Sequence, residues 1–464
     1  METRRSDLVV IGCGIAGLSA GLRGAELGMD VTILEKAPKA ERGGQTRYSE
    51  SFRAPSASTD LSEWGYEFAV PDYTEQDFYD DIMARTDGSA DPELARTVVE
   101  NAGPTIEWLT SHGVEWDMEP LAVGYVAGRT WFDSPELIEH LVTTIEDLGG
   151  EIHYEAEARD LDLADDHSVE AVTAVVDDRF VRFECEAAVL ATGGYESSEE
   201  KRAKYIGAGF EEMKVRGSPF NTGEGIDMAV DAGANAVGQW SGAHMAIIDA
   251  ASPAFGGGAN RVDGYQYGLI LNKNGERFVD EGEDARAHTY AKFGRLIFEE
   301  PEHVAYIVVD SKVHDLVRAT GPSDPVIADT VPDLLAELDI DESTAEQTVS
   351  AFNDACDPGE FDPEVLDGND AQLDPPKSNW ALPVDEPPFY AYAVTGGITF
   401  GFGGVEITSS GEVKDSRGHV ISGLYGAGNS TGGLFYNNYP GGTGLTNAAV
   451  FGKLAAEHAH ESSE

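Results

Sequence analysis

The stretch that decides the fold is DLVVIGCGIAGLSA at residues 7–20, followed by VTILEK at residues 31–36. Residues 8–11 form an unbroken apolar run, which is typical of a strand buried on both faces of a parallel sheet. Residues 15–27 have helical periodicity, Gly28 ends that pattern, and a second apolar run follows at 31–34. The order strand, helix, strand predicts a βαβ unit.

The turn of this unit carries the spacing G-x-G-x-x-G at Gly12, Gly14 and Gly17. The first glycine permits a tight turn, the second lets a pyrophosphate approach the backbone, and the third lets helix and strand pack closely. Glu35 ends the second strand, where a carboxylate accepts the hydroxyls of an adenosine ribose and disfavours the 2′-phosphate of NADP. A glycine-rich turn that binds nothing is the alternative, and the flanking strands and the acid disfavour it.

The composition is strongly acidic. The 464 residues include 31 Lys and Arg against 84 Asp and Glu, a formal net charge of −53. Acid clusters recur along the chain, so we interpret the charge as a solvated acidic surface. Self-repulsion of this size calls for strong screening, which molar salt supplies. We therefore expect a halophilic protein of a high-salt cytoplasm, and the negative field disfavours nucleic acid or an anionic membrane as a partner.

The cysteines indicate a reducing compartment. Cys13, Cys185 and Cys356 have no C-x-x-C neighbour, so we expect no zinc site, no iron–sulfur cluster and no metal. Arg4 and Arg5 resemble the start of a twin-arginine signal, but no apolar export segment follows them. No apolar run approaches the length of a membrane-spanning helix, which predicts a cytoplasmic chain that does not itself span a membrane.

Glycine-rich character divides the chain. Residues 187–194 repeat the pattern of a buried strand ending in Thr-Gly-Gly, and glycine-rich segments return at 423–428 and 441–446. The segment between about 239 and 398 has no fingerprint glycines but has short strands, helices and Pro/Asp-rich connectors. We expect an α/β fold in which a dinucleotide-binding domain, residues 1–238 and 399–464, is interrupted by a second domain at 239–398.

Several further segments carry a more specific pattern. They are RGGQTR at 42–47, NTG at 221–223, SGAH at 241–244, GERFVDEG at 275–282 with Arg286, KSNWA at 377–381, GITF at 397–400, FGG at 402–404 and GGLFYNNYPGGTGLT at 432–446. In this order they resemble flavoproteins of the fumarate reductase/succinate dehydrogenase family, most of all those of the tricarballylate dehydrogenase type. The resemblance covers nearly the whole chain. It implies a Rossmann-like FAD-binding domain interrupted by an α+β cap domain that holds the substrate over the flavin.

The resemblance implies FAD as the cofactor. Relatives that attach FAD covalently use a histidine after the second strand, and residues 36–47 contain none, so FAD is expected to be non-covalent. The glycines at 441–446 precede a helix whose N-terminus would stabilise negative charge on the reduced flavin, although a tight turn alone is the alternative. The residues expected to bind FAD are Gly12, Gly14, Ala16, Gly17, Glu35, Lys36, Gly43, Gly44, Thr46, Ala191, Thr192, Gly193, Asn221, Gly428, Asn429, Gly444, Leu445 and Thr446.

Two catalytic roles follow from the same resemblance. Arg286 matches the arginine that exchanges a proton with the substrate carbon, one position later than in fumarate reductases. Its ordinary pKa lies above 12, so this role requires neighbouring acids and reduced flavin. A structural arginine among surrounding acids is the alternative. His244 matches a histidine that binds a substrate carboxylate, and a satisfied core histidine is its alternative.

The chain departs from fumarate reductases at two further positions. Thr399 stands where they have a second histidine, and Tyr439 where they have an arginine, which weakens a two-carboxylate clamp for fumarate. The YPGG pattern at 439–442 is shared with the tricarballylate type and is similar to ketosteroid Δ1-dehydrogenases. Thr399 and Tyr439 are expected to hydrogen-bond the substrate, and Arg47 and Arg216 are the favoured carboxylate ligands because both adjoin segments that should line the flavin cleft.

These observations predict an FAD-dependent oxidoreductase that acts on a CH–CH bond. The expected reaction is dehydrogenation of a small polycarboxylate, such as tricarballylate to cis-aconitate, with hydride transfer to flavin N5. A fumarate-reductase-like enoate reductase and a ketosteroid Δ1-dehydrogenase are the alternative enzymes; a non-catalytic flavin subunit and an NAD-binding module also stay open. The sequence has no cluster or haem motif, so electrons should pass to a separate partner, which the resemblance implies is an iron–sulfur membrane protein.

Overall fold

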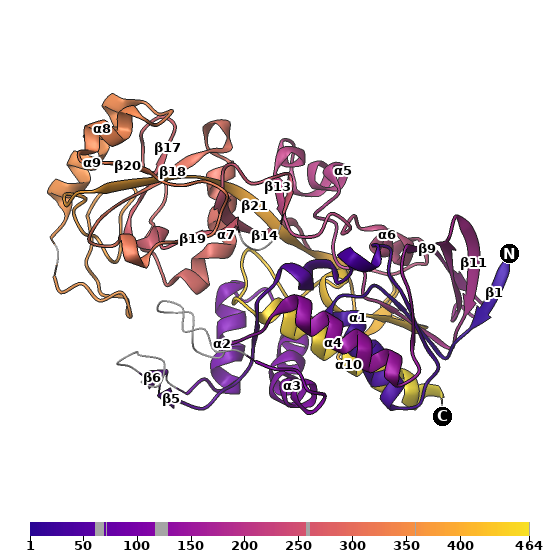
Figure 1. Cartoon of the computed structure of the whole chain (residues 1–464). Coiled ribbons are helices and arrows are strands. Elements are labelled where there is room, and N and C mark those ends of the chain that lie inside the picture. Colours follow the sequence, from indigo (N-terminus) through magenta and orange to yellow (C-terminus); the bar gives the residue numbers. More distant parts are fainter. Residues whose placement is uncertain (61–68, 71, 117–128, 257–259, 358, 464) are drawn as a thin grey trace.

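The computed structural model describes residues 1–60, 69–70, 72–116, 129–256, 260–357 and 359–463. Two parts are visible in Figure 1: a larger α/β part that holds both termini, and a smaller part built from the middle of the sequence. A long strand, β21 (Phe389–Val405), runs between them. The α/β class expected from the sequence is confirmed.

The larger part is built on a six-stranded sheet of order β22-β23-β12-β2-β3-β8. Its strands are β2 (Leu8–Ile11), β3 (Val31–Leu34), β8 (Glu151–His153), β12 (Ala187–Leu190), β22 (Glu412–Lys414) and β23 (Val420–Gly426). All neighbours are parallel except β22 and β23. The apolar runs at 8–11 and 31–34 are wholly buried here, because a parallel sheet is covered on both faces.

Helices cover this sheet. α1 (Ile15–Glu26) connects β2 to β3, and α10 (Thr443–Ser463) packs along it. The Cβ that an alanine would add at Gly452 of α10 would overlap the carbonyl oxygen of Ala16, so the two helices meet through glycine. The other helices of this part are α2 (Glu75–Arg85), α3 (Pro92–Ser111), α4 (Ser134–Asp147) and α6 (Glu224–Asp231). The short α5 (Glu199–Lys201) lies toward the smaller part (Figure 1).

A second, four-stranded sheet lies at the N-terminal edge of this part, in the order β1-β11-β10-β9. Its strands are β1 (Glu2–Arg5), β9 (Ala156–Leu163), β10 (Val169–Val176) and β11 (Arg179–Glu184). Short pairs join β4 (Ser51–Arg53) to β7 (Arg129–Trp131), and β5 (Thr59–Asp60) to β6 (Ala69–Val70). The loop at residues 42–47, which forms one side of the site, leads into β4.

The smaller part contains a seven-stranded sheet centred on β21. The path is β15-β13-β21-β18-β17, and β14 and β20 also pair with β21. The elements are β13 (Lys214–Arg216), β14 (Ala236–Asp249), β15 (Phe255–Gly256), β17 (Leu269–Asn272), β18 (Ala305–Asp310), β20 (Val326–Ala328), α7 (Arg286–Phe298), α8 (Val331–Ala336) and α9 (Glu342–Ala355), with a short β16 (Val262–Asp263) and β19 (Arg318–Ala319) pair beside them. A separate apolar core lies around Leu335 and Phe352.

The β14–β21 pair joins the two parts. Its register runs from Ala236 opposite Val405 to Asp249 opposite Val394, with interruptions beside His244. The domain limits expected at 238/239 and 398/399 both fall inside these two strands, and that division stays a prediction. The pair positions the site, because His244 on β14 lies opposite Phe400 on β21.

Candidate active site

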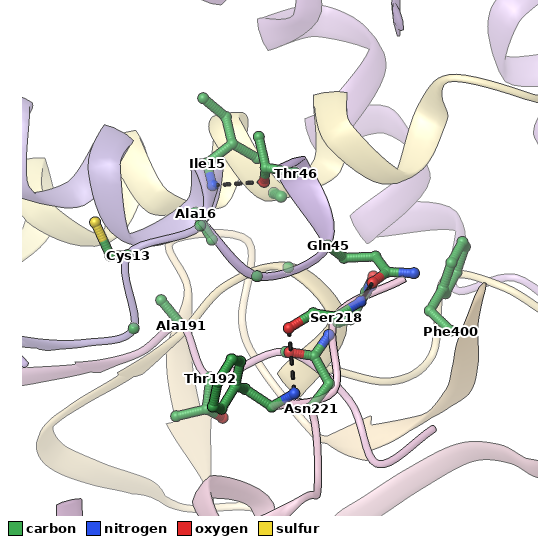
Figure 2. Close-up of a pocket in the computed structure, with 18 of the residues that line it drawn as sticks. Cys13, Ile15, Ala16, Gln45, Thr46, Ala191, Thr192, Ser218, Asn221 and Phe400 are labelled. Carbon is green, nitrogen blue, oxygen red and sulfur yellow. Dashed lines mark hydrogen bonds between the residues drawn. The ribbon is translucent and has the colours of Figure 1, made fainter. Parts of the chain in front are cut away.

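One large cavity extends from the β2–α1 turn to the middle of the β14–β21 pair, at His244 and Phe400 (Figure 2). Its volume is about 1440 Å³, open mouth included. The residues expected to bind FAD that line it are Gly12, Gly14, Ala16, Glu35, Lys36, Gly44, Thr46, Ala191, Thr192, Gly193, Asn221, Gly428, Asn429, Gly444 and Leu445. They come from both ends of the chain and from its middle, so the cavity is a property of the whole larger part.

The fingerprint turn forms one wall. Gly12 has φ +111°, and a Cβ there would overlap the carbonyl oxygen of Ala191. The backbone N–H of Ile15, at the start of α1, donates to Thr46 Oγ1 at 2.9 Å (Figure 2). This bond joins the loop at 42–47 to the helix N-terminus, so two segments that the sequence assigned to FAD binding lie beside one another.

Glu35 and Lys36 line the cavity next to this turn. The Glu35 carboxylate is buried and accepts hydrogen bonds from the backbone N–H groups of Cys13 and Ala37, at 2.9 and 2.8 Å. Burial raises the pKa of Glu35 above its ordinary value, and these bonds oppose the rise. Lys36 Nζ donates to Thr222 Oγ1 at 2.6 Å and pairs with Glu224 at 2.9 Å. Glu35 is therefore a fixed acceptor.

Behind the opposite wall lies a buried carboxyl group that the sequence analysis missed. Asn221 Nδ2 donates to Glu196 Oε1 at 2.7 Å, and Glu196 has no exposed surface. Among the described residues, Glu196 Oε2 has no hydrogen-bond partner. Burial raises the pKa of Glu196 to about 7. Only its place in the segment after Thr-Gly-Gly could have drawn attention to it.

These walls fit FAD. The hydroxyl of Thr192 lies on the lining, buried and without a hydrogen-bond partner among the described residues. Gly12 and Gly14 leave the backbone open where side chains would narrow the cavity, and a helix N-terminus faces it. The residues present thus offer the donors, acceptors and space that a dinucleotide cofactor requires.

Five of the residues expected at the site do not line the cavity, as far as the described part of the chain shows. Gly17 serves helix–strand packing, because a Cβ there would overlap the carbonyl oxygen of Gly12. Gly43 has φ +107° and lies against Ile138. Thr446 Oγ1 donates to the carbonyl of Arg53 at 2.7 Å, which attaches α10 to β4. The other two are Arg47, in a short 3₁₀ segment (Gly44–Tyr48), and Arg286.

Beyond the dinucleotide walls, the cavity ends at a buried polar group. Arg216 Nη1 donates to Thr399 Oγ1 at 3.4 Å, and both side chains line the cavity. No ion pair to a carboxylate is found for Arg216 among the described side chains, and its Nε has no hydrogen-bond partner there. Burial, with Arg261 nearby, lowers the pKa of Arg216. A guanidinium in this setting is prepared to bind an anion.

His244 lies beside Arg216. It is 1% exposed, and neither ring nitrogen has a hydrogen-bond partner among the described residues. The rings of Tyr290, Phe400 and Tyr439 surround it at centroid distances of 4.9, 5.4 and 5.1 Å. Burial, together with the charge of Arg216, holds the pKa of His244 well below its ordinary value. His244 is therefore a neutral imidazole at neutral pH, with one donor and one acceptor nitrogen.

Arg286 begins α7, beneath this end of the cavity. Its Nε donates to Asp263 Oδ1 at 2.6 Å, and its guanidinium lies 4.4 Å from the ring centroid of Tyr290. Burial lowers the pKa of Arg286 to about 10 and raises the pKa of Asp263 to about 6. Asp263 also lies 3.8 Å from Arg261 Nε, and Arg261 forms an ion pair with Glu50. Asp263 thus lies between Arg286 and Arg261, and Glu50 pairs with Arg261.

The sequence analysis also missed three residues that line the cavity: Tyr290, Gln45 and Glu50. Tyr290 lies one helical turn after Arg286, so the helix period could have identified it. Gln45, inside RGGQTR, donates from Nε2 to the carbonyls of Arg216 and Thr399, at 2.9 and 2.5 Å. Glu50 carried no motif in the sequence; the fold alone brings it to Arg261.

Comparison with known proteins shows the family of the chain. The family model described as FAD binding domain matches residues 7–445. The chain is 27% identical to a probable fumarate reductase of Shewanella frigidimarina, covering 98% of this chain and 74% of that protein. It is 26% identical to the NADH:acrylate oxidoreductase of Vibrio harveyi, covering 98% of this chain and half of that protein. It is also 26% identical to the urocanate reductase of Eggerthella lenta, with shares of 98% and 74%.

Two solved structures show the same fold. A flavocytochrome c3 fumarate reductase in its open conformation aligns with a TM-score of 0.75 and 24% identity, over 99% of this chain and 78% of the other. A 3-ketosteroid Δ1-dehydrogenase from Sterolibacterium denitrificans aligns with a TM-score of 0.79 and 19% identity, over 99% and 100%. In the part of the chain that is described, no helix is both long and apolar enough to cross a bilayer.

Proposed function

Because the chain belongs to the FAD-binding oxidoreductases of the fumarate reductase and succinate dehydrogenase type, we propose that it acts on a CH–CH bond next to a carboxylate. The observation that carries the proposal is the buried Arg216, without a carboxylate partner among the described residues, beside the unpartnered imidazole of His244. Burying these groups is costly unless a ligand satisfies them. A substrate carboxylate would satisfy both.

Bound FAD supplies a two-electron acceptor or donor of hydride. Gly12, Gly14 and Glu35 would hold it at the fingerprint end, and Asn221 and Gly444 along the cavity. The attachment is proposed to be non-covalent, since residues 36–47 contain no histidine.

The chain's own residues have separate tasks in this proposal. Arg216 binds the carboxylate through its guanidinium, and Thr399 orients that guanidinium. His244, which is neutral, hydrogen-bonds the same carboxylate or a neighbouring polar group. Arg286 and Asp263 serve the exchange of the substrate proton. Water is excluded because the aromatic rings around His244 enclose this end of the cavity.

Tricarballylate, oxidised to cis-aconitate, is the substrate that the sequence motifs favour. Reduction of an enoate is the second candidate, and it is favoured by the names of the relatives, which include fumarate, acrylate and urocanate reductases. A ketosteroid is disfavoured as a substrate, because two arginines, Arg216 and Arg261, line the cavity. We also propose a cytoplasmic, high-salt setting and a separate electron-transfer partner, of which an iron–sulfur membrane protein is the candidate.

The test uses holoenzyme purified anaerobically in molar KCl. Tricarballylate, succinate and propionate are added to the oxidised enzyme, and cis-aconitate, fumarate, acrylate and urocanate to the dithionite-reduced enzyme, while flavin absorbance is followed. We expect one acid to change the flavin redox state. With that acid, Arg216→Gln should raise KM by at least 100-fold, roughly the 3 kcal/mol of a charged hydrogen bond, and Arg216→Lys should raise it less.

Arg85→Gln is the matched control. Arg85 pairs with Asp284 at 2.7 Å and does not line the cavity within the described residues, so its loss should leave KM unchanged. If none of the seven acids changes the flavin, or if Arg216→Gln keeps the wild-type KM, the proposed function is wrong.

A further inference from the structure

Two tyrosines meet at the substrate end of the cavity. Tyr290 projects from α7, and Tyr439 lies in the segment just before α10. Their hydroxyl oxygens are 2.6 Å apart, both residues are buried, and both line the cavity. One hydroxyl therefore donates to the other, which gives this end of the cavity a hydrogen-bonded phenol pair.

Arg286 lies over the ring of Tyr290, and it is not among the described residues that line the cavity. Its guanidinium is held by Asp263 at 2.5–2.6 Å and lies 4.4 Å from the centre of the Tyr290 ring. A cation over a phenol favours the negative charge that forms when the phenol releases its proton. The hydroxyl of Tyr439 favours the same charge by hydrogen bonding to it.

The other groups at this end of the cavity are less suited to proton exchange. The pKa of His244 lies well below its ordinary value, so its imidazole is a weak base. Glu50 already forms an ion pair with Arg261. Thr399 is an alcohol, which is less acidic than a phenol and receives its hydrogen bond from Arg216.

We infer that Tyr290, paired with Tyr439, exchanges the proton with the substrate carbon, and that Arg286 acts through Tyr290 as a positioning residue. The inference rests on the proposed function and changes the residue that carries out its acid–base step. Arg286, which the family resemblance assigns to that step, then stabilises charge on the phenol and touches no substrate.

In the direction of oxidation, the bond between hydrogen and the carbon next to the carboxylate breaks. The proton goes to the ionised oxygen of Tyr290, and the electron pair of the broken bond forms the C=C bond. The neighbouring carbon gives up a hydride, for which bound FAD would be the two-electron acceptor, so the two electrons lost by the substrate are accounted for. The proton on Tyr290 is released to solvent after the product leaves, and reduction of an enoate runs through the same positions in reverse.

The experiment compares Tyr290→Phe with Tyr265→Phe in the holoenzyme. Tyr265 is the matched control, because it is also buried and its hydroxyl bonds to Thr289 Oγ1 at 2.6 Å, one residue before Tyr290, yet it does not line the cavity within the described residues. Stopped-flow absorbance follows reoxidation of reduced flavin by cis-aconitate, fumarate, acrylate and urocanate. The Kd of each acid for the oxidised enzyme, which cannot turn it over, is measured from the flavin spectrum.

For the acid that reoxidises the wild type, we expect Tyr290→Phe to slow the step at least 100-fold, as loss of an acid–base group does. Its Kd for the acid should stay within about 3-fold of the wild type, because Arg216 and His244 are intact. Tyr265→Phe should keep the wild-type rate. Arg286→Lys should recover most of the rate that Arg286→Gln loses, because a cation over the ring is what Tyr290 needs.

The outcomes are distinguishable. If an acid reoxidises the flavin equally fast in the wild type and in Tyr290→Phe, the role of Tyr290 is wrong and the proposed function stands. If Tyr290→Phe and Tyr265→Phe lose the same rate, the effect is structural and the inference is also wrong. If no acid reoxidises the wild type, the proposed function itself fails, and the role of Tyr290 fails with it.

Discussion

At Glu196 the chain buries a carboxyl group directly behind the cavity wall. Asn221, its hydrogen-bond donor, lines the cavity, so the carboxyl group holds the side-chain amide of a lining residue in place. Burial raises the pKa of Glu196 from 4.5 to about 7. The folded state therefore holds a proton that the unfolded chain releases at lower pH, and the free energy of unfolding falls as pH rises from 4.5 through 7.

We expect Glu196→Gln to remove this pH-dependent loss. Relative to the wild type, the free energy of unfolding of the variant should rise by about 2.5 kcal/mol between pH 5 and pH 8, because this window covers most of the interval between the two pKa values. Urea unfolding followed by tryptophan fluorescence at constant KCl measures the difference. Glu200→Gln, an exposed acid on the neighbouring α5, should follow the wild type at both pH values. If the free energy of unfolding changed equally between pH 5 and pH 8 in Glu196→Gln and in the wild type, the raised pKa of Glu196 would be contradicted.

Among the elements, α7 decides the geometry of the substrate end, because it carries both Arg286 and Tyr290. The helix lies directly on the β14–β21 pair. A Cβ at Gly294 would overlap the carbonyl oxygens of Ala246 and Met245, so the glycine sets the distance between helix and strand. At this separation the phenol of Tyr290 lies 2.6 Å from the hydroxyl of Tyr439.

Gly294→Ala should therefore lower both stability and activity. The added methyl group has to displace backbone, which costs about 1–3 kcal/mol, and the shift of α7 separates Tyr290 from Tyr439. Thermal unfolding of the holoenzyme and the flavin reoxidation rate measure the two effects. Gly103→Ala on α3 is the control, since a Cβ there meets no heavy atom beyond its chain neighbours. The usual gain from Gly→Ala in a helix is offset by the following Pro104, so stability and rate should stay close to those of the wild type. Equal stability of both variants would show that the spacing of α7 is not constrained.

For the whole molecule, charge is the dominant property. A net charge of −53 on 464 residues repels itself, while the cavity is lined by two buried arginines, Arg216 and Arg261, of which Arg216 is the proposed carboxylate ligand. In the proposed high-salt setting, salt would screen the surface, since the Debye length falls from about 10 Å at 0.1 M to about 3 Å at 1 M. The buried cations are screened much less, so a high-salt setting is compatible with binding a carboxylate at Arg216.

We expect the melting temperature of the holoenzyme to rise steadily as KCl increases from about 0.1 M to above 1 M. At about 1 M the Debye length is only about 3 Å, so repulsion between the surface carboxylates is largely screened. Differential scanning fluorimetry measures it, and glycerol at matched water activity is the control, because an uncharged solute does not screen. A melting temperature independent of KCl would contradict the interpretation of the acidic surface as a high-salt adaptation.

The local sequence was sufficient for the cofactor half of the protein. The run 7–20 with Glu35 specifies a βαβ unit through continuous periodicity and glycine spacing, and these depend on neighbours in sequence. The structure accordingly places Gly12, Gly14 and Glu35 on one cavity wall, and the family model confirms an FAD-binding fold. Arg216, Thr399 and His244, which were expected as substrate ligands, also lie together at one end of that cavity; their roles stay predictions.

Only the tertiary structure decided how the substrate end is assembled. The Tyr290–Tyr439 pair, the contact of Arg286 with Asp263 and the ion pair of Glu50 with Arg261 join segments that no sequence period links. Each contact depends on the β14–β21 pair and on the spacing of α7, which bring the middle of the chain against its two ends. Sequence periodicity determines which face of an element is buried, whereas the partner of a buried polar group is determined by packing between elements.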